Sequence, residues 1–171
     1  HWPRNEKDAL HLVNGVYFSW DADKGDVTLN VQPELGALMH LSASVQKAPG
    51  WLTFNIELGD ATLDPGDIIG VVVEFEGFSG ETLPLFIRSA RKGELQDTWL
   101  QDKLIGTDSR AVQTLFHQIK ANEPVSAGPA YHTLVLPLPK RDFALELRDM
   151  RVFVIPAARG LRLEPATVLE T

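Results

Sequence analysis

Two tryptophans, Trp51 and Trp99, have the surroundings that most suggest a chemical role. Trp99 lies in the segment Gln96-Asp97-Thr98-Trp99-Leu100-Gln101, where amides, a carboxylate and an indole are neighbours. Trp51 begins an expected strand and is out of phase with the buried residues of that strand. Flat aromatic rings stack on the apolar C–H faces of sugars while polar neighbours bind the hydroxyl groups. The sequence therefore predicts a sugar-binding patch with stacking by Trp99 and Trp51 and hydroxyl recognition by Asp97, Gln101 and Arg88.

The direction of the Arg88 side chain decides whether this patch can form. Arg88 shares one face of its expected strand with Phe86, and Leu85 and Ile87 occupy the other face. If Leu85 and Ile87 face the core, Arg88 points outward, and Trp99 must lie on the same outer face. The alternative is that the tryptophans are core or rim aromatics, which is at least as common an environment for them. Aromatic residues make up only 8% of the chain, which is few for a surface that grips a polysaccharide.

The segment Asp21-Ala22-Asp23-Lys24-Gly25-Asp26 concentrates three carboxylates, and hard oxygen ligands of this kind suit Ca²⁺. The spacing differs from that of an EF-hand loop. The alternative is a hairpin turn between strands at 17–20 and 27–31, with Lys24-Gly25 at its tip. Structural calcium at Asp21, Asp23 and Asp26 is the only metal site that this pattern suggests, and we expect no required cofactor.

Other catalytic or metal-binding patterns are weak. Glu74 and Glu76 face the same way on one expected strand, but the paired carboxylates of glycoside hydrolases flank the sugar from different strands. The sequence contains no Gly-x-Ser-x-Gly motif, phosphate loop or dinucleotide fingerprint. No two histidines fall within five residues of each other, and the absence of cysteine excludes disulfides and thiolate metal sites. We therefore expect a protein that is not an enzyme.

Composition limits the partners. The chain has 171 residues, 44% hydrophobic and 23% charged, which predicts one globular domain over residues 1–171. Its formal net charge of −7 disfavours nucleic acid and anionic membranes as partners. No apolar run reaches the ~20 residues that span a bilayer as a helix. The lack of cysteine does not fix the compartment, since many bacterial envelope proteins also lack it, and we expect a periplasmic or secreted protein.

The hydrophobic pattern predicts an all-β fold. Segments such as 27–31 and 52–58 alternate apolar and polar residues, as strands with one buried face do, whereas 68–75 and 134–138 are apolar on both faces and predict central strands. Turn signals separate them, which favours an antiparallel two-sheet β-sandwich. The predicted core contains Leu29, Leu41, Phe54, Ile56, Val73, Phe75, Leu136 and Leu145.

Two segments depart from simple alternation. Val112, Leu115, Phe116 and Ile119 have the i, i+3, i+4, i+7 spacing of one helix face, which predicts a short helix near 109–121, with an edge strand as the alternative. In the segment 143–155 the apolar phase slips at Arg148-Asp149, which predicts a β-bulge or bend.

The order of strands and turns resembles that of carbohydrate-binding modules of the jelly-roll, galactose-binding-like type. One stretch is Trp51-Leu52-Thr53-Phe54-Asn55-Ile56-Glu57-Leu58, followed by Asp64-Pro65-Gly66-Asp67 and an apolar strand, which is similar to their middle hairpin. The other is Glu146-Leu147-Arg148-Asp149-Met150-Arg151-Val152, which is similar to their penultimate strand entry. In some of these modules an Asp there helps to hold a structural calcium ion, so the resemblance implies such a role for Asp149.

These observations lead to three functional hypotheses. The first is a non-catalytic accessory module that binds a glycan ligand. The second is a protein-interaction or structural domain of a larger polysaccharide-related protein, whose partner is another protein or its own parent chain. The third, ranked last, is a small jelly-roll enzyme that cleaves glycans, and two carboxylates about 5–10 Å apart across one cleft would favour it.

Overall fold

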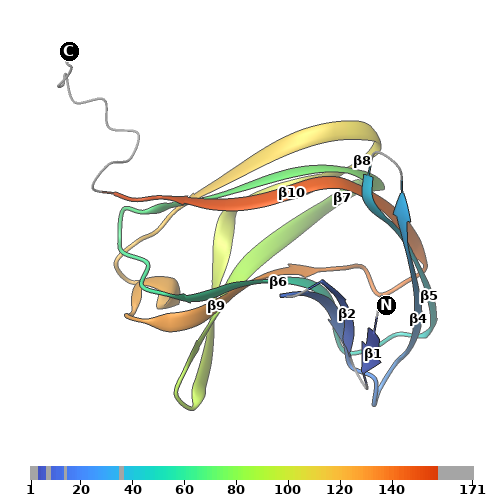
Figure 1. Ribbon diagram of the computed structural model, residues 1–171, viewed down its shortest axis with the longest axis horizontal. Helices are drawn as coiled ribbons and strands as arrows, with labels where there is room; N and C mark the ends of the chain where they lie inside the picture. The colour runs from blue at the N-terminus through green and yellow to red at the C-terminus, as the bar shows by residue number, and fades with distance from the viewer. Residues whose placement is uncertain (1–3, 7–8, 14, 35–36, 158–171) are drawn as a thin grey trace.

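The computed structural model describes residues 4–6, 9–13, 15–34 and 37–157, and these residues form two stacked layers of antiparallel strands (Figure 1). The described strands, in chain order, are β1 (Arg4–Glu6), β2 (Ala9–Val13), β3 (Val16–Trp20), β4 (Asp26–Glu34), β5 (Ala37–Lys47), β6 (Leu52–Ala61), β7 (Ile68–Arg91), β8 (Glu94–Gln118), β9 (Ala130–Pro137) and β10 (Phe143–Ile155). A 3-10 turn, η1 (Pro124–Ser126), follows β8.

The strand pairing defines the two layers. The first layer, which we call the groove sheet, contains β1, β2, β3, β6 and β9, followed by the second half of β7 and the first half of β8. The second layer, which we call the back sheet, contains the second half of β8, the first half of β7, β10, β5 and β4. The predicted antiparallel β-sandwich is therefore confirmed, and β7 and β8 are shared by both of its sheets.

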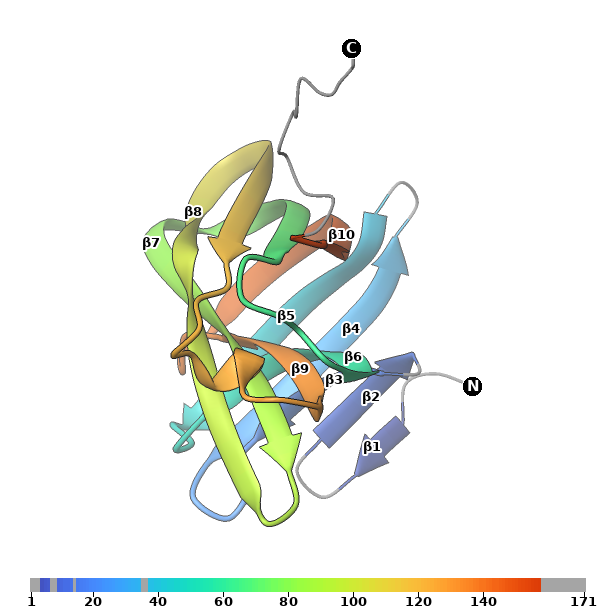
Figure 2. The same cartoon turned by 90° about the vertical axis from the view of Figure 1, so that its left-hand side faces the viewer.

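Strands β7 and β8 pass from one sheet to the other at a glycine-rich bend (Figure 2). The pairing jumps from Gly77 opposite Thr107 to Thr82 opposite Ile105, and Phe78 adopts a positive φ of 54° within this gap. Gly106 lies directly against the backbone carbonyl of Phe78, where a Cβ atom would have no room. Glycine is required here because the two chains approach each other too closely for a side chain.

Apolar side chains from both sheets fill the space between the layers. The rings of Phe18 and Phe54, on neighbouring strands of the groove sheet, lie 4.9 Å apart between centroids. Leu41 of the back sheet is fully buried in the same core. Of the predicted core residues, Leu41, Phe54, Val73, Phe75, Leu136 and Leu145 are buried, and Leu29 and Ile56 are partly buried and pack against the core.

The predicted helix near 109–121 is wrong, and the alternative of an edge strand is confirmed. Residues 111–118 pair with β7 as the second half of β8, and β8 has no other strand partner among the described residues. Leu115 and Ile119 are buried whereas Val112 and Phe116 are exposed, so the side chains alternate with a period of two. The helix-like spacing combined residues from opposite faces of a strand, and the β-branched and aromatic residues there favour extended structure.

Of the other local predictions, the bulge in β10 is confirmed and the two hairpins are wrong. The expected bulge in β10 is confirmed by a register shift between Leu147 and Asp149, which brings Met150 and Val152 back against the core. The hairpin expected around Lys24-Gly25 is wrong, because β3 pairs with β2 and β6 whereas β4 pairs with β5. The segment 21–25 instead connects the two sheets. Likewise β6 and β7 do not pair, so the expected middle hairpin is also a connection between sheets.

Truncation of Phe54 tests the inward face of β6. Because the Phe54 ring is buried and contacts Phe18, replacement by alanine removes its packing and leaves a cavity. We expect Phe54→Ala to lower the free energy of unfolding by about 3–5 kcal/mol. Chemical denaturation measures this change, and a loss below about 1 kcal/mol would mean that the face has been assigned incorrectly.

Substitution of Gly106 tests the bend that joins the sheets. We expect Gly106→Ala to lower the free energy of unfolding by about 3 kcal/mol or more, because the new methyl group meets the rigid Phe78 carbonyl. Gly93→Ala at the β7–β8 hairpin is the control, since open space surrounds it and its left-handed backbone alone costs roughly 1–2 kcal/mol. Equal losses in the two variants would contradict a close approach at Gly106.

Candidate ligand-binding groove

Five side chains form one row across the outer face of the groove sheet. The strand registers place Tyr17 opposite Asn55, Asn55 opposite Val135, Val135 opposite Phe86, and Phe86 opposite Trp99. The row therefore runs perpendicular to β3, β6, β9, β7 and β8 and is about 19 Å long at the usual strand spacing. It brings three aromatic rings, an amide and an aliphatic side chain onto one line.

The period of two in each strand places this row on the outer face. Phe18, Leu134 and Ile87 are almost fully buried in the core, so their neighbours in each strand point away from it. The sequence required Arg88 and Trp99 to share the outer face if Leu85 and Ile87 face the core. The structure shows this arrangement, and 52% of Trp99 is exposed.

A groove of about 560 Å³ lies over the row from Tyr17 to Phe86. It combines the outer faces of β3, β6, β9 and β7 with the loops that precede β6 and follow β9. The lining residues are Tyr17, Ser19, Gly50, Trp51, Leu52, Thr53, Asn55, Phe86, Arg88, Val135, Pro137, Leu138 and Lys140. Trp51 and Arg88 are thus in the groove wall, and Trp99 extends the row beyond it.

At the β8 end of the row, four predicted or neighbouring residues form a cluster. The rings of Phe86 and Trp99 are 4.7 Å apart between centroids, and the guanidinium carbon of Arg88 lies 5.3 Å from the Phe86 ring centre. Arg88 donates Nε–H and Nη2–H bonds of 2.9 and 3.0 Å to the two oxygens of Asp97. This bidentate bond fixes the guanidinium beside the aromatic pair, and it also raises the pKa of Arg88 above its usual value.

Trp51 lies at the other end of the groove and is 49% exposed. Its indole Nε1–H donates to the Ser19 hydroxyl over 3.4 Å, which ties the ring to β3. The Lys140 ammonium donates to the Gly50 carbonyl over 3.2 Å, so the loop after β9 closes on the loop that carries Trp51. An accessible indole and an ammonium group therefore lie together at this end.

Neutral polar groups form the floor between the two ends. Asn55 is buried, and its amide donates to the Thr53 hydroxyl over 3.0 Å and to the Tyr17 carbonyl over 3.3 Å. Ser19 and Thr53 add hydroxyl groups that line the same groove. Such groups both donate and accept hydrogen bonds, which is the chemistry that sugar hydroxyls require.

Tyr131 and Glu57 form a further pair on the same sheet. The Tyr131 hydroxyl donates to Glu57 Oε1 over 2.5 Å, and this bond to an ionised acceptor raises the pKa of Tyr131 to about 12. Burial, followed by the Glu57 charge, also raises the pKa of Tyr17. Both tyrosines therefore remain neutral hydroxyl groups across the physiological range of pH.

The two places predicted to hold calcium, the segment Asp21–Asp26 and Asp149, lie in different parts of the fold. Asp21 is buried in the connection between the sheets, near Asp23 and Asp26 in sequence, whereas Asp149 is on β10 of the back sheet. Arg151 donates two bonds to Asp149, and these lower the pKa of its carboxyl group. The described part of the chain contains no group of three or more His, Cys, Asp or Glu side chains arranged to hold a metal ion. Structural calcium stays a prediction.

One predicted ligand residue, Gln101, bonds to the back sheet, and several residues of the groove were not predicted. Gln101 uses its side-chain oxygen to accept the backbone N–H of Gln118 over 3.3 Å. The residues missed are Tyr17, Asn55, Phe86, Val135 and Lys140. For the first four, alternation along each strand places the side chain outward, but only the register between distant strands shows that they share a row. Lys140 lies in the loop after β9, where alternation gives no guide.

Comparisons with known proteins support the fold. Neither the models of known protein families nor the curated proteins match this sequence. A solved family 4 carbohydrate-binding module superposes with a TM-score of 0.57 at 10% identity, over 82% of this chain and 86% of that one. The family 30 carbohydrate-binding module of a cellulosomal cellulase from Clostridium thermocellum gives 0.50 at 12% identity, over 88% and 95%. A Stig cyclase from Fischerella sp. TAU gives 0.49 at 10% identity, over 91% and 89%.

At these identities the likeness shows the fold alone. The chain has the jelly-roll β-sandwich seen in carbohydrate-binding modules, and the resemblance predicted from its sequence is confirmed as a diffuse one. The described residues contain no helix with the length and apolar character needed to cross a membrane.

The Tyr131–Glu57 bond makes a direct prediction about titration. We expect Glu57→Gln to return the pKa of Tyr131 from about 12 toward the usual value near 10, because the ionised acceptor is lost. Ultraviolet absorbance or NMR titration can follow it, since the chain has only two tyrosines. Glu94→Gln at the β7–β8 hairpin is the control and should leave the titration unchanged. A Tyr131 titration that Glu57→Gln does not move would contradict the bond.

Proposed function

We propose that this protein binds a glycan along the groove sheet, as a non-catalytic accessory module. The observation that carries the proposal is the row from Tyr17 to Trp99, which crosses five strands and continues the floor of the groove. A row of this length accommodates several linked sugar rings. Aromatic rings supply the stacking surfaces, and amide and hydroxyl groups between them supply hydrogen bonds.

The placement of the two tryptophans supports an extended ligand. Trp51 lies before β6 and Trp99 lies on β8, so three strand spacings, about 14 Å, separate them in the direction of the row. Both indoles are about half exposed, and each is held by its neighbours, Trp51 by Ser19 and Trp99 by Phe86. Aromatic rings that are accessible and already oriented lose little conformational entropy when a ligand binds.

The charges of the groove support binding over cleavage. The lining residues include two basic side chains, Arg88 and Lys140, and no carboxylate. The nearby Asp97 carboxylate is engaged by Arg88 through both oxygens. Glycoside hydrolysis uses two carboxylates across the scissile bond, and the groove walls do not provide such a pair.

Truncation of Trp99 tests this proposal. A glycan array and calorimetry with its hits measure affinity, and thermal unfolding measures stability. We expect Trp99→Ala to reduce glycan affinity about tenfold or more, as loss of an aromatic platform does. Its effect on stability should be well below the ~3–5 kcal/mol of a buried aromatic residue, because half of the side chain is exposed.

Phe153→Ala is the control for this experiment. Phe153 is also an exposed aromatic residue, but it lies on β10 of the back sheet. This variant should retain full glycan affinity. If no glycan binds to the wild-type protein, or if both variants bind as well as wild type, the proposal is wrong.

A further inference from the structure

The chain forms a bulge immediately after Trp99. Phe86 pairs with Trp99 and Pro84 pairs with Lys103, so three residues of β8 lie opposite the single residue Leu85. A bulge leaves backbone groups without partners in the ladder and re-aims the neighbouring side chains. The orientation of Trp99 therefore depends on what holds Leu100, Gln101 and Asp102.

The far end of the same strand holds this bulge. The Gln101 N–H donates to His117 Nδ1 over 2.9 Å. The Gln118 N–H donates to the Gln101 side chain over 3.3 Å, and the Phe116 N–H donates to the Asp102 carboxylate over 2.8 Å. Residues 116–118 belong to the back sheet, so these three bonds join the two sheets at their open edge.

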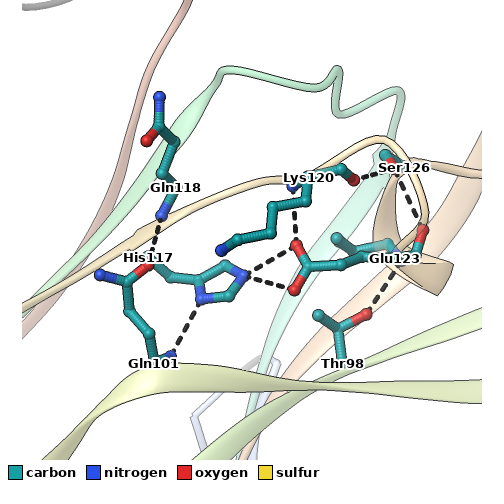
Figure 3. Close-up of polar contacts among 8 residues, drawn as sticks. Thr98, Gln101, His117, Gln118, Lys120, Glu123 and Ser126 are labelled. Atoms are coloured by element: carbon teal, nitrogen blue, oxygen red, sulfur yellow. Dashed lines mark hydrogen bonds and ion pairs between the residues drawn. The ribbon is translucent and has the colours of Figure 1, made fainter.

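His117 has a defined role among these contacts (Figure 3). Its ring is 2% exposed and lies between the Gln101 N–H and the Glu123 carboxylate. Since Nδ1 accepts a hydrogen bond from a backbone N–H, it carries no proton, and Nε2–H must donate to Glu123 over 3.0 and 3.1 Å. One imidazole tautomer therefore connects the bulge to the loop that precedes η1.

The residue before Trp99 is held by the same loop. The Val125 N–H of η1 donates to the Thr98 hydroxyl over 3.0 Å, and both residues are buried. Glu123 also accepts the Lys120 N–H over 2.8 Å, which fixes the position of its carboxylate. Residues on both sides of Trp99 are thus bonded to residues 116–125, through the Thr98 hydroxyl before it and the Gln101 N–H after it, although none of residues 116–125 lines the groove.

We propose that His117 is a positioning residue for glycan binding, which holds the bulge at Gln101 so that the Trp99 ring lies on the row. This inference rests on the proposed function of the groove. It assigns His117 no contact with the ligand. Its two ring nitrogens have separate tasks: Nδ1 fixes the bulge, and Nε2 fixes the ring to Glu123.

Two substitutions separate these tasks. His117→Asn places an amide oxygen near the position of Nδ1 and can still accept the Gln101 N–H. His117→Gln places an amide nitrogen near the position of Nε2, keeps a donor for Glu123, and leaves the Gln101 N–H without its acceptor. Glu123→Ala is a milder variant at a more accessible site, which frees the ring without removing it.

Three measurements are made on each variant: glycan affinity, hydrogen exchange at the Gln101 amide, and the fluorine NMR signal of 5-fluorotryptophan at position 99. We expect His117→Gln to increase the exchange rate of the Gln101 amide about tenfold and to weaken glycan affinity about tenfold, the factor expected for loss of one hydrogen bond. It should also shift the fluorine signal of residue 99. His117→Asn should stay near wild type in all three, because it keeps the acceptor for the Gln101 N–H. Glu123→Ala removes the acceptor of both the His117 ring and the Lys120 N–H, so it loosens the ring and its loop together and should fall between the two.

The outcomes distinguish the two proposals. If wild type binds glycan and His117→Gln binds equally well with an unchanged Trp99 signal, the positioning role is wrong while the proposed function stands. If His117→Asn is as defective as His117→Gln, the Gln101 contact is not the cause, and the inference is overturned. If His117→Gln does not fold, Glu123→Ala decides, and wild-type behaviour there overturns it. If wild type binds no glycan, the proposed function fails, and exchange and fluorine signals alone decide whether His117 positions Trp99.

Discussion

The close approach of β7 and β8 at their shared bend is the constraint on which the groove depends. Both strands leave the back sheet near Gly77 and Gly106 and continue in the groove sheet. The second half of β7 contributes Phe86 and Arg88, and the first half of β8 contributes Asp97 and Trp99. A change in the bend would turn this hairpin relative to β9 and break the row that starts at Tyr17 on β3. The glycines at the bend therefore matter to the site although they lie outside it.

Because β8 pairs only with β7 among the described strands, its other side is an exposed edge whose backbone N–H and C=O groups need hydrogen-bond partners. Both halves of β8 lie at the side of their sheets, and strand edges with unpaired N–H and C=O groups invite association with other chains. Side chains of β8 itself supply some of these partners: Gln113 bonds both the N–H and the C=O of Ile105, and His117 accepts the Gln101 N–H. This arrangement covers the edge without a further strand. It also connects the backbone beside Trp99 to the back sheet, so edge protection and site geometry use the same bonds.

The sequence predicts the local features well and the long-range ones poorly. Alternation correctly identified Phe54 and Leu41 as core residues, and the phase slip in β10 correctly indicated a bulge. The helix near 109–121 failed because four apolar residues matched a helix period by combining both faces of a strand. The hairpin at Lys24-Gly25 failed because a turn signal does not show which strand comes next in the sheet. Neighbouring strands here are often far apart in the chain, and that information is not local.

In the candidate site, local patterns predict side-chain direction but not which strands are neighbours. The outward direction of Arg88 and Trp99 follows from the buried Leu85 and Ile87, because side chains in a strand alternate. The pairing of Arg88 with Asp97 needed only the hairpin between them. Tyr17 and Asn55 needed the order β3, β6, β9, β7, which no local pattern contains.

Trp99 and Trp51 are about half exposed although both are large apolar residues. Single exposed apolar residues are common on protein surfaces and need no function. Trp99 and Trp51 are each about half exposed, and each contacts a neighbouring side chain, Trp99 that of Phe86 and Trp51 that of Ser19. Fixing a side chain costs conformational entropy, and a ring that stays half in water recovers only part of the hydrophobic gain of burial. A core role would bury these two indoles, and the proposed glycan binding rests on their being both accessible and held by neighbouring side chains.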